Sequence, residues 1–225
     1  MAYGLYLYKQ IINQGNRVVR IEIYQKDYSG ASIEINSLQS ATLVMDNQGE
    51  DLIAPIIKSS LNFTLVNTNQ FNYEVFFTPD ATKFKVVYKL DGVTEWTGYL
   101  TPDSYMESLV FRDTISLVAR DNLGMLDEMK FNYLPYWSVA SPQSILTNAL
   151  SKIGFDMTIE WASLKTDSDN TNIKDVNIIT RQYNNDKSWF EFISILLSSL
   201  ALQMRYVGGN KYKIVDINKF KPLLS

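Results

Sequence analysis

Residues 95–126 read EWTGYLTPDSYMESLVFRDTISLVARDNLGML, and this stretch indicates how the chain is organised. Its pattern predicts a strand, a turn, a long alternating strand and a short helical turn broken by a glycine. We expect Trp96 and Tyr99 to pack in a core rather than form a ligand platform. Asp103 is expected as a turn former and Asp121 as a helix N-cap. The stretch has the residues of a structural joint, without those of an active site.

The joint also predicts where one part of the chain ends and the next begins. Asp121-Asn122-Leu123-Gly124 should mark the passage from a β-domain to an α+β unit. If Gly124 has a positive φ, Gly124→Val should lower the stability of the whole chain, because a β-branched residue is strained there.

Upstream of the joint, apolar and polar residues alternate, which is typical of strands with one buried face. The expected strands are residues 3–8, 19–24, 31–36, 39–45, 56–66, 83–89 and 94–100, while residues 71–77 fit either a strand or a short aromatic-rich bridge. A turn at residues 27–30 predicts that strand 31–36 pairs with strand 19–24, and Asp91-Gly92 predicts a hairpin. The lysines at 83, 85 and 89 are expected either on a solvated face or as charges that discourage pairing at a sheet edge.

Downstream, the pattern becomes partly helical. Ser141 and Pro142 predict the start of one helix, which Gly154 ends. Ser188 and Glu191 form a capping box that starts a second. Strands are expected at residues 156–161, 176–183, 203–207 and 211–215. The expected fold class is therefore α+β: an antiparallel β-barrel or sandwich over residues 1–132, then a smaller α+β domain over 133–225 with two helices packed on a small sheet.

Composition narrows the possible chemistry. The 225 residues include no cysteine and no histidine, which removes thiolate nucleophiles, the commonest general base and the commonest metal ligand. Net charge is −3 with Lys and Arg scattered along the sequence, so no nucleic-acid partner is expected. The most apolar run, residues 190–202, is too short to cross a bilayer, and the N-terminus has no secretory signal. We expect a protein made in a cytoplasm without membrane insertion.

Candidate catalytic groups are few. A carboxylate pair for glycoside hydrolysis could come from Glu95, Asp103, Glu107 and Asp121, although a sequence does not show whether they converge. Residues 167–170 resemble the start of a calcium loop but lack its later glycine and glutamate. Gly208-Gly209 is expected as a hairpin turn, and no phosphate-binding glycine loop occurs. The sequence therefore predicts no catalytic, cofactor-binding or metal-binding residue.

Residues 96–103, WTGYLTPD, followed by Ala119-Arg120-Asp121-Asn122-Leu123-Gly124-Met125-Leu126, resemble a recurrent segment of bacteriophage tail proteins, best represented in phages and prophages of Bacteroides-type gut bacteria. Residues 187–216 resemble a second element of tail hub proteins, with Ser188-Trp189 opening a helix and Gly209, Tyr212, Ile214 and Asp216 in the closing hairpin. The resemblance covers most of the chain and implies the first part of a tail hub or tail-tip baseplate protein.

The resemblance implies a virion structural protein that is not an enzyme. It would form a homo-oligomeric ring, often a trimer, between the tail tube and fibre or tip proteins. Hubs are usually longer than this chain, so the sequence is either part of a longer hub or a reduced relative such as a distal tail protein.

Two alternatives remain from the residues. One is a glycan-binding β module that stacks sugars on exposed Trp96, Trp137, Trp161 or Trp189. The other is an enzyme that relies on carboxylates alone, such as a tail-associated muralytic domain.

Overall fold

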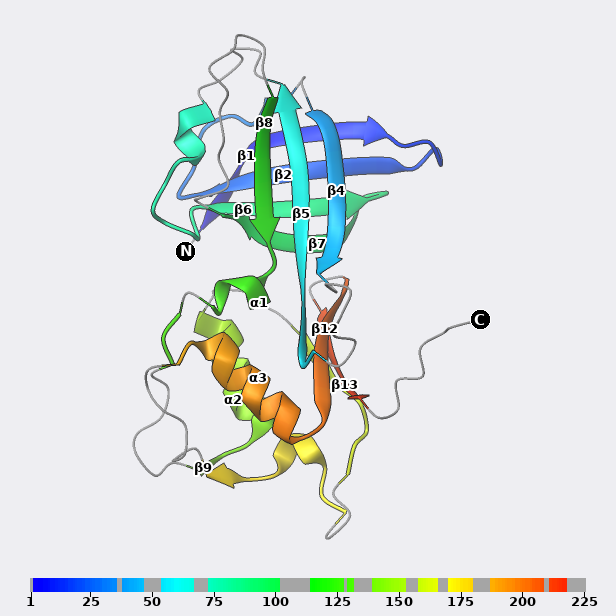
Figure 1. The fold of residues 1–225 in the computed structure, drawn as a ribbon. Helices are drawn as coiled ribbons and strands as arrows, with labels where there is room; N and C mark the ends of the chain where they lie inside the picture. The colour runs from blue at the N-terminus through cyan, green and yellow to red at the C-terminus, as the bar shows by residue number, and fades with distance from the viewer. Residues whose placement is uncertain are drawn as a thin grey trace. The chain divides into compact units, whose positions relative to one another are not determined.

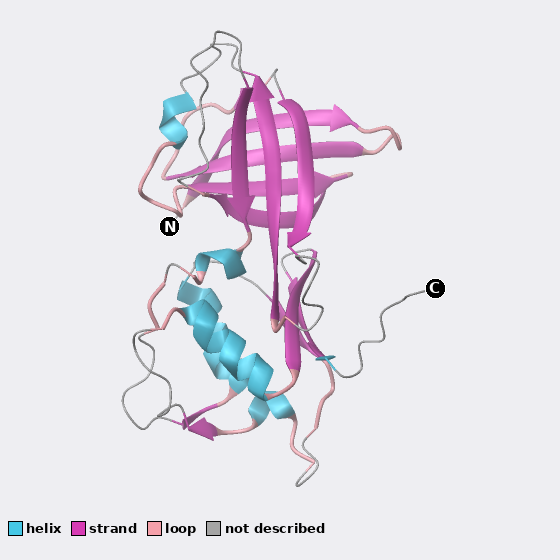
Figure 2. Cartoon of the chain, viewed as in Figure 1, coloured by secondary structure: helices cyan, strands magenta, loops and turns pink. Residues whose placement is uncertain are grey.

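The computed structural model describes residues 2–35, 38–46, 54–66, 73–101, 114–127, 129–131, 139–152, 158–165, 170–179, 187–208 and 211–217. Within these residues the protein is mostly β-strand with few helices, an α+β composition (Figures 1 and 2). Its contacts divide it into two compact units. The first comprises Met1–Asp46, Ser59–Asn122 and Gly208–Asn210; the second comprises Asn47–Lys58, Leu123–Val207 and Lys211–Ser225.

The first unit is built on one twisted path of hydrogen-bonded strands, in the order β4-β5-β8-β7-β6-β2-β1-β3. These are β1 (Tyr3–Ile12), β2 (Val18–Lys26), β3 (Ile33–Glu34), β4 (Leu38–Asp46), β5 (Ile56–Val66), β6 (Phe84–Leu90), β7 (Val93–Leu100) and β8 (Thr114–Arg120), with a short helix η1 at Tyr73–Phe76. In Figure 1, β8, β5 and β4 cross in front of β1, β2 and β6. The pairings of the described strands leave this sheet unclosed, so the barrel or sandwich stays a prediction.

Register explains where the core of the first unit lies. Leu7 pairs with Ile23, and Ile23 pairs with Val86, so one face of the sheet carries a row of apolar side chains. All three are fully buried. Leu61 and Leu117, on β5 and β8, are buried in the same alternation. Period-two patterning thus places the core on one face and leaves polar residues on the other.

The second unit combines helices with a small group of strands. It holds α1 (Asn122–Met125) from Leu123 on, β9 (Val139–Ala140), α2 (Pro142–Lys152), β10 (Thr158–Trp161), η3 (Ile173–Asp175), β11 (Ile178–Ile179), α3 (Trp189–Ser199), β12 (Leu202–Gly208) as far as Val207, and β13 (Lys211–Asp216). β10 pairs with β13, β13 with β12, and β12 with the first residues of β5. β5 therefore belongs to both units, because its remaining residues pair with β8 in the first.

The two main helices begin as the sequence predicts. Ser141 Oγ accepts from the Ser144 N–H at 3.2 Å, immediately before α2. At α3, Ser188 Oγ accepts from the Glu191 N–H at 3.1 Å while Glu191 accepts from the Ser188 N–H at 3.0 Å, which completes the capping box. The apolar stripe of α3 is buried, and Phe192 stacks on Phe131 with ring centroids 4.0 Å apart. Helix caps are thus predictable from local sequence.

Two sequence expectations are wrong, and a third does not apply because its condition is not met. Strand 31–36 does not pair with β2: β3 pairs in parallel with β1, while β2 pairs with β1 and β6. A two-residue strand after a turn gives no local signal of which neighbour it will join. Gly124 lies inside α1, and the described glycines with positive φ are Gly92 and Gly208, so backbone strain at Gly124 gives no reason for a stability loss. The solvated lysine face is also corrected below.

Candidate functional site

The proposed carboxylate pair is not found among the described residues. Asp121 is fully buried, and its Oδ2 accepts from the Ser59 N–H at 2.8 Å and from the Ser59 hydroxyl at 2.7 Å. The indole Nε1 of Trp96 donates to the Ser59 Oγ at 2.9 Å. Asp121 stands directly before α1, as expected for a cap, but a substrate has no access to it. Asp103 and Glu107 lie outside the described residues.

A second carboxylate, Glu22, lies at the centre of a charged cluster on the outer face of the first unit. It is 3% exposed although its neighbours on β2, Arg20 and Tyr24, lie on the polar side of the strand pattern. Its Oε1 lies 2.8 Å from Arg20 Nε, and its Oε2 lies 2.7 Å from Lys89 Nζ. The Tyr24 hydroxyl donates to Oε2 at 2.8 Å. Three side chains from the strands, those of Arg20, Lys89 and Tyr24, therefore contact the same buried carboxylate.

The electrostatics of this cluster follow from those contacts. Burial alone would raise the pKa of Glu22, but hydrogen bonds from Lys89 and Tyr24 and the charges of Lys89 and Arg20 lower it overall. Burial and the bond to Glu22 raise the pKa of Tyr24 to about 12. Glu22 is consequently ionised, and Tyr24 remains a hydrogen-bond donor, at neutral pH.

Tyrosine rings line the same face. The guanidinium carbon of Arg20 lies 4.6 Å from the Tyr8 ring centroid. Lys85 Nζ lies 5.1 Å from the Tyr3 ring centroid and 5.2 Å from that of Tyr24. Burial lowers the pKa of Lys85. The lysines of β6 are thus not simply solvated, which corrects the sequence expectation: Lys85 lies between aromatic rings, and Lys89 neutralises Glu22.

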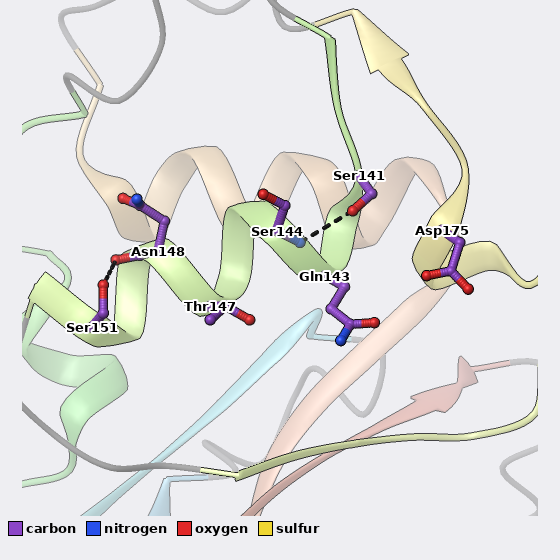
Figure 3. Close-up of a pocket in the computed structure, with 7 residues that line it drawn as sticks. All are labelled: Ser141, Gln143, Ser144, Thr147, Asn148, Ser151 and Asp175. Carbon is purple, nitrogen blue, oxygen red and sulfur yellow. Dashed lines mark hydrogen bonds between the residues drawn. The ribbon is translucent and has the colours of Figure 1, made fainter.

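A polar groove of about 530 Å³ lies along α2 in the second unit (Figure 3). Its lining consists of Ser141, Gln143, Ser144, Thr147, Asn148 and Ser151 from α2 and the cap before it, with Asp175 from η3. Part of this polarity serves the helix itself, since the Ser151 hydroxyl donates to the Asn148 carbonyl at 2.8 Å. Among the described residues, this lining offers hydroxyl, amide and carboxylate groups and includes no aromatic side chain.

Tryptophan exposure counts against the glycan-binding alternative. Trp96 and Trp189 are fully buried, and Trp161 is half-buried. Trp137 lies outside the described residues. An exposed indole face for sugar stacking is absent from the described part of the chain.

Among the described residues no three acidic side chains gather as metal ligands would. The calcium-loop candidate at 167–169 falls outside these residues, as does Gly209 of the predicted hairpin turn. In the part of the chain that the structure describes, none of the helices combines the length and apolar character needed to span a membrane.

Sequence reasoning missed the Glu22 cluster. Alternation placed Arg20, Glu22 and Tyr24 on one face, which was the only available signal. The burial of Glu22 depends on Lys89 and Tyr8, which lie on the neighbouring strands β6 and β1.

Comparison with known proteins gives a fold likeness. No family model matches the chain, and no curated protein sequence matches it. Among solved structures, the 43 kDa tail protein of prophage MuSo2 from Shewanella oneidensis is similar with a TM-score of 0.50 at 15% identity, over 88% of this chain and 54% of that one. A tail protein from Neisseria meningitidis MC58 gives a TM-score of 0.48 at 13% identity, over 77% of this chain and 44% of that one.

The Francisella PdpA-VgrG complex gives a TM-score of 0.45 at 13% identity, over 81% of this chain and 27% of the matched chain. This chain thus spans about half the length of the two tail proteins, and less of the third structure. The first likeness shows that the fold of this chain is similar to that of a prophage tail protein. At 15% identity, it establishes the fold alone.

Proposed function

We propose that this chain is a structural component of a phage tail, located in the virion at the tail tip as a baseplate hub or distal-tail-like protein. The fold likeness to the MuSo2 tail protein over 88% of the chain is the observation that supports this role. The motif order of residues 96–126 and 187–216 points the same way. We further propose a ring, a trimer in the simplest case, that joins the tail tube to fibre or tip proteins.

The proposed role is structural rather than catalytic. The buried hydrogen bonds from Ser59 to Asp121 support this, because a substrate cannot reach that carboxylate. Under this proposal, the function of the protein is to bind other tail proteins.

Purified particles from the producing bacterium test the location. We expect mass spectrometry to find this chain in the particles, and antibody-gold labelling to place it at the tail tip. Particles that lack it, or label along the tail shaft, would contradict the proposal. A tape-measure gene upstream and a fibre gene downstream would support it independently.

The ring is tested separately. Light scattering and negative-stain microscopy of the full-length native protein, alone and with neighbouring tail proteins, should show a closed oligomer. A monomer in both conditions would contradict the proposed ring. It would not contradict the proposed location in the virion.

A further inference from the structure

Basic side chains that are scattered in the sequence gather on one sheet face in the structure. Cross-strand pairing places Arg20 beside Lys89, Lys85 beside both Tyr24 and Tyr99, and Tyr99 beside Arg120. Directly paired residues of neighbouring strands point to the same side of a sheet. We call this outer side of β2, β6, β7 and β8 the basic face. Its cations are Arg20, Lys26, Lys83, Lys85, Lys89 and Arg120.

The charge of the basic face is opposite to that of the chain. Its six cations stand against two carboxylates, Glu22 and Asp80, the latter ion-paired to Lys26 at 3.1 Å, which leaves a net +4. If Asp27 and Glu95, which lies at the bulge of β7, are also counted, the net charge of the face is +2. The whole chain carries −3, so the residues outside the face carry −7. This segregation is a property of the fold, since the cations come from three strands and an adjoining turn.

Three cations of the basic face, Arg20, Lys85 and Lys89, are held by contacts with aromatic rings or with Glu22. The Arg20 guanidinium lies over Tyr8, and Lys85 lies close to two tyrosine rings. The side chains of Arg20 and Lys89 are 32% and 25% exposed, which leaves part of each in reach of a partner. Arg120 is exposed at the end of β8. Ordered side chains lose less entropy when a partner docks, so such a face is suited to binding.

We propose that the basic face docks an acidic segment of another tail protein. The inference rests on the proposed function, which supplies the class of partner, and adds the chemistry of the contact. Tyr and Arg are the residue types enriched at protein–protein contacts. The cations of the face are interspersed with the carboxylates of Glu22 and Asp80, so they do not form the continuous basic stripe that is typical of a nucleic-acid-binding surface.

Binding of a fluorescent poly-glutamate peptide to the full chain, measured by anisotropy, tests the proposal. Lys83→Gln with Arg120→Gln removes two cations of the face without touching the partners of Glu22. Lys174→Gln with Lys213→Gln removes the same charge from the second unit and is the matched control. Thermal melts check that both variants fold.

We expect the peptide to bind the native protein and the binding to weaken as salt is raised. The variant of the basic face should bind roughly two- to thirtyfold more weakly, as expected for the loss of two exposed charge contacts. The control variant should bind as the native protein does.

Three results would overturn the proposal. They are no peptide binding at low salt, an equal loss in the control variant, or tighter binding of a DNA duplex of matched charge, which would mark a phosphate-binding face. A nuclear magnetic resonance titration gives a readout without any variant: the signals of Tyr24 and Lys85 should shift on peptide addition. Detection of the chain in virions is independent, so failure here is distinguishable from failure of the tail assignment.

Discussion

At the residue scale, one buried carboxylate organises the outer face of the first unit. Glu22 contacts two cations and a tyrosine hydroxyl, and loss of its charge would leave Arg20 and Lys89 facing each other. Removing one partner of a buried charge cluster costs more than the cluster contributes as a whole, because the remaining charges stay partly desolvated.

Glu22→Gln should lower the free energy of unfolding by about 1–3 kcal/mol at pH 7. Since the folded pKa of Glu22 is lowered from the ordinary value of 4.5, its contribution is full above that pH and is lost as pH falls through the folded pKa. The difference between variant and native protein should therefore shrink below pH 4.5 in urea titrations. Glu34→Gln is the control and should change little, because the Glu34 side chain is 48% exposed and lies 3.7 Å from Lys9. A difference that does not depend on pH would contradict the role of the charge.

Asp121 makes a second prediction at this scale. Asp121→Ala would leave the buried Ser59 N–H and hydroxyl without the carboxylate that they now contact. We expect a loss of about 2–3 kcal/mol in the free energy of unfolding. The exposed Asp175, changed to Ala, is the comparison and should leave stability almost unchanged. Equal effects at both positions would show that the Ser59 contact is not structural.

At the element scale, the approach of β7 to β8 explains the glycine of the WTGYL segment. A Cβ at Gly98 would overlap the Arg120 carbonyl oxygen and the ring of Trp96, so only glycine allows the two strands to approach. This reason is steric and does not involve a positive φ.

Gly98→Ala should therefore destabilise the protein by about 1–3 kcal/mol or more, as overpacking does. At Gly15, in the turn after β1, a Cβ would meet only the Asn13 Oδ1 at 3.4 Å. Gly15→Ala is the matched control and should leave the melting temperature within a degree or two of the native value, roughly as expected for a tolerated surface change. Similar melting temperatures for the two variants would show that β7 and β8 have room to move apart.

At the scale of the whole molecule, β5 is the element that both units use. Ile56 and Ile57 pair with β12 in the second unit, while Ser60 to Val66 pair with β8 in the first. A strand that contributes hydrogen bonds to two units cannot unfold in one without loss in the other. The domain boundary expected at residue 132 remains a prediction. Each of the two compact units consists of segments that are not continuous in sequence.

We accordingly expect a single cooperative unfolding transition by calorimetry. Leu61→Ala in the first unit and Phe192→Ala in the second each remove a fully buried side chain and should each lower the stability by about 2–5 kcal/mol. Both variants should shift the one transition. Two separate transitions, only one of which moves in each variant, would show that the shared strand does not couple the units.

The sequence by itself determined the elements of this protein. Alternation located β1, β2 and β4 to β7 within a few residues, and capping residues located the starts of α2 and α3, because strand period and helix caps are short-range properties. The absence of histidine and cysteine narrowed the available chemistry in the same way.

The tertiary structure decided which strands meet. The parallel partner of β3, the sharing of β5 and the gathering of six cations on the basic face all depend on pairings between residues far apart in the chain. Such pairings are fixed by how the whole chain packs its apolar faces, which no local pattern encodes. Glu22, an ordinary outward-facing residue in the sequence, is buried because its neighbours come from other strands.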